Sequence, residues 1–104
     1  MPDIILILTT MPDDGRADTL ARTLVEERLA ACVNVHAPMR STYWWKGQIE
    51  CEGERQLVIK TRTEQRAKLE ARLRALHPYQ LPEFVVLEVG GSAAYAEWVA
   101  AETA

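Results

Sequence analysis

The chain has 104 residues, of which 48% are hydrophobic and 26% charged, and its net charge at pH 7 is −3. We therefore predict a single folded domain over residues 1–104 and exclude a disordered chain. The acidic balance gives no basis for nucleic-acid or anionic-membrane partners, so neither is expected. Two cysteines do not make a disulfide framework, and no signal-peptide pattern is found, which favours a cytoplasmic protein with reduced thiols.

The first third of the chain predicts a strand followed by a helix. Residues 4–8 are continuously apolar, as in a strand that is buried on both faces. Aspartates at 13 and 14 can cap a helix, and apolar residues from Ala17 to Val25 then recur at helical spacing. We expect this first helix to end near Ala31.

The middle of the chain predicts a long hairpin. Apolar residues alternate from Val33, and the chain continues through Pro38 to the pair Trp44-Trp45. Residues 46–48 supply a turn, and the return arm runs to the apolar residues 57–59. Because proline cannot donate a ladder hydrogen bond, Pro38 predicts an edge or a bulge in the first arm.

The last third predicts a helix, a strand and a short final helix. Thr63 can cap the second helix, and the dipeptide His77-Pro78 stops it. Residues 84–87 form another continuously apolar strand, and Ser92 can cap the last helix.

The element order β-α-β-β-α-β predicts an α+β, ferredoxin-like sandwich with an additional C-terminal helix. In this fold the helices cover one face of the sheet. A second face open to water should carry polar residues at alternate positions, but residues 4–8 and 84–87 do not alternate. The second face must therefore be covered, by the last helix and by another copy of the chain, so we predict a homo-oligomer.

Residues 77–83, His-Pro-Tyr-Gln-Leu-Pro-Glu, are here named the proline segment. Two prolines four residues apart exclude a helix interior or a central strand, so the segment must be a stiff connector. It carries an imidazole, a phenol and a carboxylate. Two interpretations stay open: a site or partner surface, and a simple helix stop followed by a strand start.

Cys32 and His36 suggest a metal site, but their spacing excludes local chelation. Four residues of strand span ~13 Å, whereas two ligands of one ion lie within about 4 Å of each other. Ligands would have to converge from distant segments or from other subunits, and the alternative is that Cys32 is a small buried residue.

Acidic and aromatic residues of the hairpin also offer two interpretations each. Glu50, Glu52 and Glu54 alternate, so they share one face of the return arm, where they form either a site for a hard cation or a solvated edge. Trp44 and Trp45 point to opposite faces of their strand, so one is free for an interface.

Several motifs together resemble the CutA family of divalent-cation tolerance proteins. They are residues 27–34 (Glu-Arg-Leu-Ala-Ala-Cys-Val-Asn), 43–50 (Tyr-Trp-Trp-Lys-Gly-Gln-Ile-Glu), Lys60-Thr61, the proline segment, and Tyr95 with Trp98. The resemblance implies a ferredoxin-like protomer that assembles into a homotrimer. It also implies an association with copper and other divalent metal ions, and no enzymatic reaction.

The resemblance carries over to individual residues in two groups. Cys32 and His77 match positions proposed as copper contacts in some bacterial members. A further cysteine of those members corresponds here to Thr9 or a neighbour, which argues against tight Cu(I) binding. The resemblance thus implies weakly bound Cu or Zn and no required cofactor. A second group matches residues near the clefts between subunits: Trp45, Glu54, Lys60, Tyr79 and Glu83.

Two functions follow from these observations. One is a trimeric, copper-binding metal-tolerance protein, and the other is a small-ligand sensor or scaffold that resembles PII-type signalling proteins and binds its ligand in intersubunit clefts. A small enzyme that uses Glu83 and Tyr79 is a third, less favoured possibility.

Overall fold

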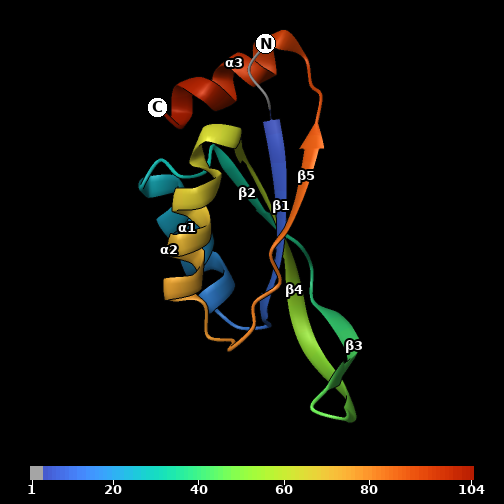
Figure 1. Ribbon diagram of the computed structural model, residues 1–104. Helices are drawn as coiled ribbons and strands as arrows, with labels where there is room; N and C mark the ends of the chain where they lie inside the picture. The colour runs from blue at the N-terminus through green and yellow to red at the C-terminus, as the bar shows by residue number, and fades with distance from the viewer. Residues whose placement is uncertain (1–3) are drawn as a thin grey trace.

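The computed structural model describes residues 4–104 as a sheet with two helices packed on one face and a third across its end (Figure 1). The elements in chain order are β1 (Ile4–Pro12), α1 (Arg16–Glu26), β2 (Cys32–Val35), β3 (Met39–Trp45), β4 (Gln48–Arg62), the 3-10 turn η1 (Thr63–Gln65), α2 (Arg66–Leu76), β5 (Val85–Val89) and α3 (Ala93–Glu102). The predicted α+β class and the additional C-terminal helix are confirmed.

The five strands of this part of the chain form one antiparallel sheet of order β2-β4-β1-β5, with β3 paired to the other half of β4. β1 and β2 run parallel with β4 between them, which is the split β-α-β arrangement that the element order predicts. Residues 4–8 lie between two strands, as their continuous apolar pattern predicts, and Leu6 is directly opposite both Lys60 and Leu87.

The hairpin of β3 and β4 extends beyond the rest of the sheet (Figure 1). Its two-residue turn has Lys46 at φ 50° and Gly47 at φ 81°, the left-handed geometry that matches the twist of the flanking strands. The predicted first arm is two strands rather than one. Residues 36–38 between them belong to no strand, which agrees with the interruption expected at Pro38.

Two helix boundaries differ from the prediction. α1 ends at Glu26 rather than near Ala31, because Arg28 adopts a left-handed φ of 63° and turns the chain toward β2. The α2 segment begins with a 3-10 turn, and Thr63 makes no capping hydrogen bond, so that prediction was wrong. The Ser92 cap is confirmed, since its Oγ accepts a hydrogen bond from the backbone N–H three residues on.

The core lies between the sheet and the pair α1 and α2. It is built by buried residues of odd number on the strands and by one stripe of each helix, namely Ile5, Ile7, Met11, Leu57, Ile59, Leu20, Leu24, Leu69 and Leu73. The opposite face of the sheet, here named the open face, carries the paired residues Leu6, Leu8, Val58, Val85 and Leu87. Val85 and Leu87 are 46% and 43% exposed, so this face is not closed within one chain.

Candidate functional site

A groove of about 940 Å³ lies between the β3–β4 hairpin and the proline segment. Residues of one face of β4 line it, namely Glu50, Glu52, Glu54 and Gln56. The hairpin partner β3 adds Tyr43 and Trp45, and residues 78–83 form the facing wall. The groove thus combines carboxylates with aromatic rings.

The period-2 geometry of the hairpin explains why these residues gather on one face. Tyr43 is directly opposite Glu50, and Ser41 is directly opposite Glu52. Because paired residues of an antiparallel ladder point to the same side, the alternate residues of both strands converge there. The predicted common face of the three glutamates is therefore what the register produces. The side chains of Trp44 and Trp45 point to opposite sides of β3, and both residues border the groove, Trp44 being the more exposed at 71%.

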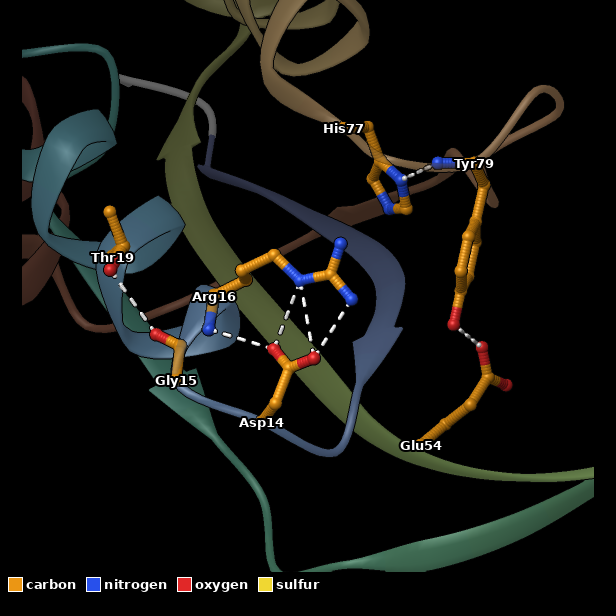
Figure 2. Close-up of polar contacts among 7 residues, drawn as sticks. All are labelled: Asp14, Gly15, Arg16, Thr19, Glu54, His77 and Tyr79. Carbon is orange, nitrogen blue, oxygen red and sulfur yellow. Dashed lines mark hydrogen bonds and ion pairs between the residues drawn. The ribbon is translucent and has the colours of Figure 1, made fainter.

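A hydrogen bond from Tyr79 to Glu54 fixes one wall of the groove (Figure 2). The Tyr79 hydroxyl donates to Glu54 Oε2 at 2.7 Å, and Glu54 is only 6% exposed. Burial, together with the hydrogen bond to the Glu54 carboxylate, raises the pKa of Tyr79 well above its ordinary value. The phenol therefore stays protonated and remains a donor at any physiological pH.

Gln56 provides a second tie to the proline segment. Its Nε2 donates to Glu83 Oε2 at 2.9 Å and to the carbonyl oxygen of Thr9 at 2.7 Å. Gln56 thus joins β4, β1 and the proline segment. Gln56 was not predicted as a site residue from the sequence, although it continues the alternating series of Glu50, Glu52 and Glu54 by one step.

His77 is held by hydrogen bonds at both ring nitrogens. Its Nδ1 accepts from the backbone N–H of Tyr79 at 3.1 Å (Figure 2). Nε2 must then carry the proton, and it donates to the carbonyl oxygen of Thr10 at 2.8 Å. Burial lowers the pKa of His77, which favours this neutral form. A metal ion at either nitrogen would displace one of these hydrogen bonds.

The structure does not bring Cys32 and His77 together within one chain. Cys32 is opposite Lys60, and Lys60 is opposite Leu6, so the thiol lies on the open face. His77 is at the end of α2 and contacts Thr9 Oγ1 at 3.4 Å on the helix-covered face. Within residues 4–104, no three or more His, Cys, Asp or Glu side chains are grouped so that they could hold a metal ion.

The structure brings together four of the five predicted cleft residues and separates the fifth from them. Trp45, Glu54, Tyr79 and Glu83 line one groove, although they come from three separate parts of the chain. Lys60 does not line this groove; it lies beside Cys32 on the open face. The nearby cation Arg16 is engaged elsewhere, because its guanidinium pairs with Asp14 at 2.8 Å (Figure 2).

Comparison with known proteins agrees with this architecture. The family model described as "CutA1 divalent ion tolerance protein" matches residues 5–102. A divalent-cation tolerance protein CutA of Pectobacterium atrosepticum is 44% identical over 98 residues, which are 93% of this chain and 89% of that protein. The Thermus thermophilus protein of the same name is 42% identical over 104 residues, 99% of each chain.

Solved structures give the same result. The crystal structure of CutA from Xylella fastidiosa superimposes with a TM-score of 0.94 at 44% identity, over 98% of this chain and 99% of that one. A rice relative is named chloroplastic and an Archaeoglobus fulgidus structure periplasmic, so the cytoplasmic location of this chain stays a prediction. Among residues 4–104, none of the helices has the length and apolar character needed to cross a membrane. The chain belongs to the CutA1 divalent ion tolerance protein family, a family of non-catalytic tolerance proteins, as its motifs predict.

Proposed function

We propose that this chain acts in divalent-cation tolerance as a homotrimer whose subunits meet on the open face of the sheet and along the hairpin. The open face is the observation that carries the proposal. Its apolar residues Val85 and Leu87 are nearly half exposed, and the hairpin adds Trp44 and Ile49, which are 71% and 63% exposed. Exposed apolar patches of this kind mark interaction sites.

The proposed partner is a second and third copy of the same chain. Among residues 4–104, β3 pairs only with β4, so the outward hairpin offers a strand edge that suits strand-to-strand contact between copies. The number three rests on the resemblance of the sequence motifs to the CutA family.

Thermal unfolding at several chain concentrations tests the assembly. If copies bind one another in the folded state, the unfolding midpoint of the wild type rises with chain concentration. Leu87→Lys places a charge on the open face and should weaken this dependence. Leu76→Lys is the matched control, because Leu76 is similarly exposed, at 39%, but lies on α2. A wild-type midpoint that does not change with concentration contradicts the proposal.

Weak binding of Cu(I), Cu(II) or Zn(II) at Cys32 is the second part of the proposal. A thiolate suits these ions, but residues 4–104 hold no group of three or more His, Cys, Asp or Glu side chains that could bind one, so other copies or solvent must complete a site at Cys32. Calorimetric titration with copper should show weaker binding to Cys32→Ala than to wild type. Cys51→Ala is the control, since this exposed cysteine lies on the opposite side of β4. Equal copper affinity of wild type and Cys32→Ala would make Cys32 a packing residue only.

A second candidate function, a small-ligand sensor or scaffold, is favoured by the groove. The contacts of Tyr79 with Glu54 and of Gln56 with Glu83 fix its wall before any ligand arrives, as a preorganised site requires. Glu83→Gln keeps the side-chain shape but removes the charge. In a thermal-shift screen of small polar compounds, this variant should lose stabilisation that the wild type shows. If the variant only lowers stability and no compound distinguishes it, the proline segment is structural.

A further inference from the structure

We propose that a cavity between the end of α1 and α3 binds a free α-amino acid with an apolar side chain. The cavity has a volume of about 370 Å³, which is at the lower end of the range of small-molecule sites. It lies where α3 crosses the end of the sheet, opposite the hairpin (Figure 1). Among residues 4–104, those that line it belong to α1, α3 and the turn after α1, and none belongs to a strand. The proposal is therefore independent of the open face, the hairpin and Cys32.

One wall of the cavity is apolar and partly open to solvent. It is formed by Val25, Ala30, Ala31 and Trp98. Val25 and Trp98 are 41% and 43% exposed, so much of their apolar surface is uncovered. The Trp98 ring packs against the Tyr95 ring with the ring centroids 5.4 Å apart, which limits its movement. An apolar side chain of a ligand would gain free energy by covering this surface.

Arg28 supplies a fixed group for a carboxylate. Its Nη1 donates to Glu102 Oε2 at 2.8 Å and to the carbonyl oxygen of the same residue at 3.3 Å. Nε and Nη2 donate no hydrogen bond to residues 4–104. Because these two nitrogens lie on one edge of the guanidinium, they can bind both oxygens of one carboxylate. The contact with Glu102 thus holds the guanidinium and leaves a bidentate edge free.

The backbone at Arg28 is strained, which independently points to a use of its side chain. The N–H of Arg28 donates to the carbonyl oxygen of Val25, and the N–H of Leu29 donates to that of Leu24. This is the Schellman pattern, in which the left-handed residue is usually glycine. Arginine at a φ of 63° carries the strain that glycine would avoid. Residues held in such a conformation cluster at ligand-binding sites.

The remaining charges favour an amino acid over a simple carboxylic acid. Glu26 and Glu102 line the cavity together with Arg28, so negative charge is in excess. Glu26 Oε2 and Glu102 Oε1 accept no hydrogen bond from residues 4–104, because Arg22 and Arg28 bind the other oxygen of each carboxylate. An ammonium group can pair with these oxygens while the carboxylate of the same ligand pairs with Arg28.

Titration with L-phenylalanine, followed by the NMR signal of the Trp98 indole N–H, tests the proposal. The signal should shift until the site is saturated, because Trp98 lines the cavity. Phenylpropionate lacks the amino group and phenethylamine lacks the carboxylate. Each should bind about tenfold more weakly than phenylalanine, since each loses one charge-assisted contact. Equal affinity for all three compounds would overturn the proposal, and so would the absence of a shift.

Arg28→Gln should weaken phenylalanine binding by about tenfold, because the bidentate contact is lost. Arg74→Gln is the matched control. The two arginine side chains are 60% and 65% exposed and each faces one glutamate, but Arg74 lies on α2 and does not line the cavity. The affinity of Arg74→Gln should stay within about twofold of the wild type, as expected for a distant surface charge. Equal weakening in both variants would show non-specific attraction and overturn the proposal.

Arg28→Gly separates binding from folding, because glycine adopts the left-handed conformation without strain. At one fixed chain concentration this variant should keep the unfolding midpoint of the wild type within a few degrees. It should nevertheless bind phenylalanine as weakly as Arg28→Gln does. If Arg28→Gly binds phenylalanine as tightly as the wild type, Arg28 serves only to hold α3 through Glu102, and the proposal is wrong.

Discussion

The Tyr79 hydroxyl lies 2.7 Å from Glu54 Oε2, and this hydrogen bond ties the proline segment to β4 at the position where β1 ends. Pro12, the last residue of β1, is directly opposite Glu54. Beyond this point the hairpin leaves the body of the sheet, so the contact sets the width of the groove at its inner end. A nearly buried carboxylate gains a donor, and the stiff segment gains a fixed position.

Replacing Tyr79 with Phe should lower the free energy of unfolding by about 1–3 kcal/mol, because a buried carboxylate loses its charge-assisted hydrogen bond. Urea unfolding at one fixed chain concentration measures this change. Tyr95→Phe is the control, since the Tyr95 hydroxyl makes no hydrogen bond with residues 4–104. Equal stability of Tyr79→Phe and Tyr95→Phe would mean that the contact contributes nothing.

Stability should fall as the pH drops below about 6.5, the ordinary pKa of histidine. Burial lowers the pKa of His77 in the folded chain, so between its folded value and 6.5 the unfolded chain binds the proton more readily. The contribution of neutral His77 to stability is therefore complete above pH 6.5, and it is lost as the pH falls through the pKa of His77 in the folded chain. Protonation would also place an N–H of His77 against the N–H of Tyr79.

Urea unfolding between pH 7.5 and 5.5 checks this dependence. His77→Gln should remove most of the decrease in stability over this range. His36→Gln should keep it, because His36 is exposed. The same decrease in wild type and His77→Gln would assign the pH effect to other groups.

Gly47→Ala should lower the free energy of unfolding by about 1–2 kcal/mol, because an L-residue at φ 81° is strained. Gly90→Ala should change stability little, since Gly90 has no positive φ and its added Cβ would meet no atom within 4 Å. Thermal unfolding compares the two variants. A Gly47→Ala variant as stable as Gly90→Ala would contradict the turn geometry.

The periodic parts of the fold were predictable from the sequence. Residues 4–8 lie between two strands of the sheet, β4 and β5, as their continuous apolar pattern predicts. Glu50, Glu52 and Glu54 share a face because strand side chains alternate with period 2. Both results follow from local geometry alone.

Contacts between distant segments were not predictable in the same way. Tyr79 and Glu54 are 25 residues apart, and their hydrogen bond depends on where α2 ends and how far β4 extends beyond β1. The left-handed Arg28 shortens α1 without a glycine to signal it. The separation of Cys32 from His77 likewise depends on which face of the sheet each occupies, and spacing along the chain does not determine that.

The most direct test of the proposed assembly is the mass of the wild-type protein in solution, measured by light scattering at micromolar chain concentration. One chain has a mass of 11.7 kDa. The proposed homotrimer predicts a particle of about three times that mass, because the exposed apolar residues of the open face and the hairpin call for other copies of the chain, and the number three follows from the resemblance to the CutA family. A measured mass of one chain would contradict the homotrimer and leave the open face without its proposed partner.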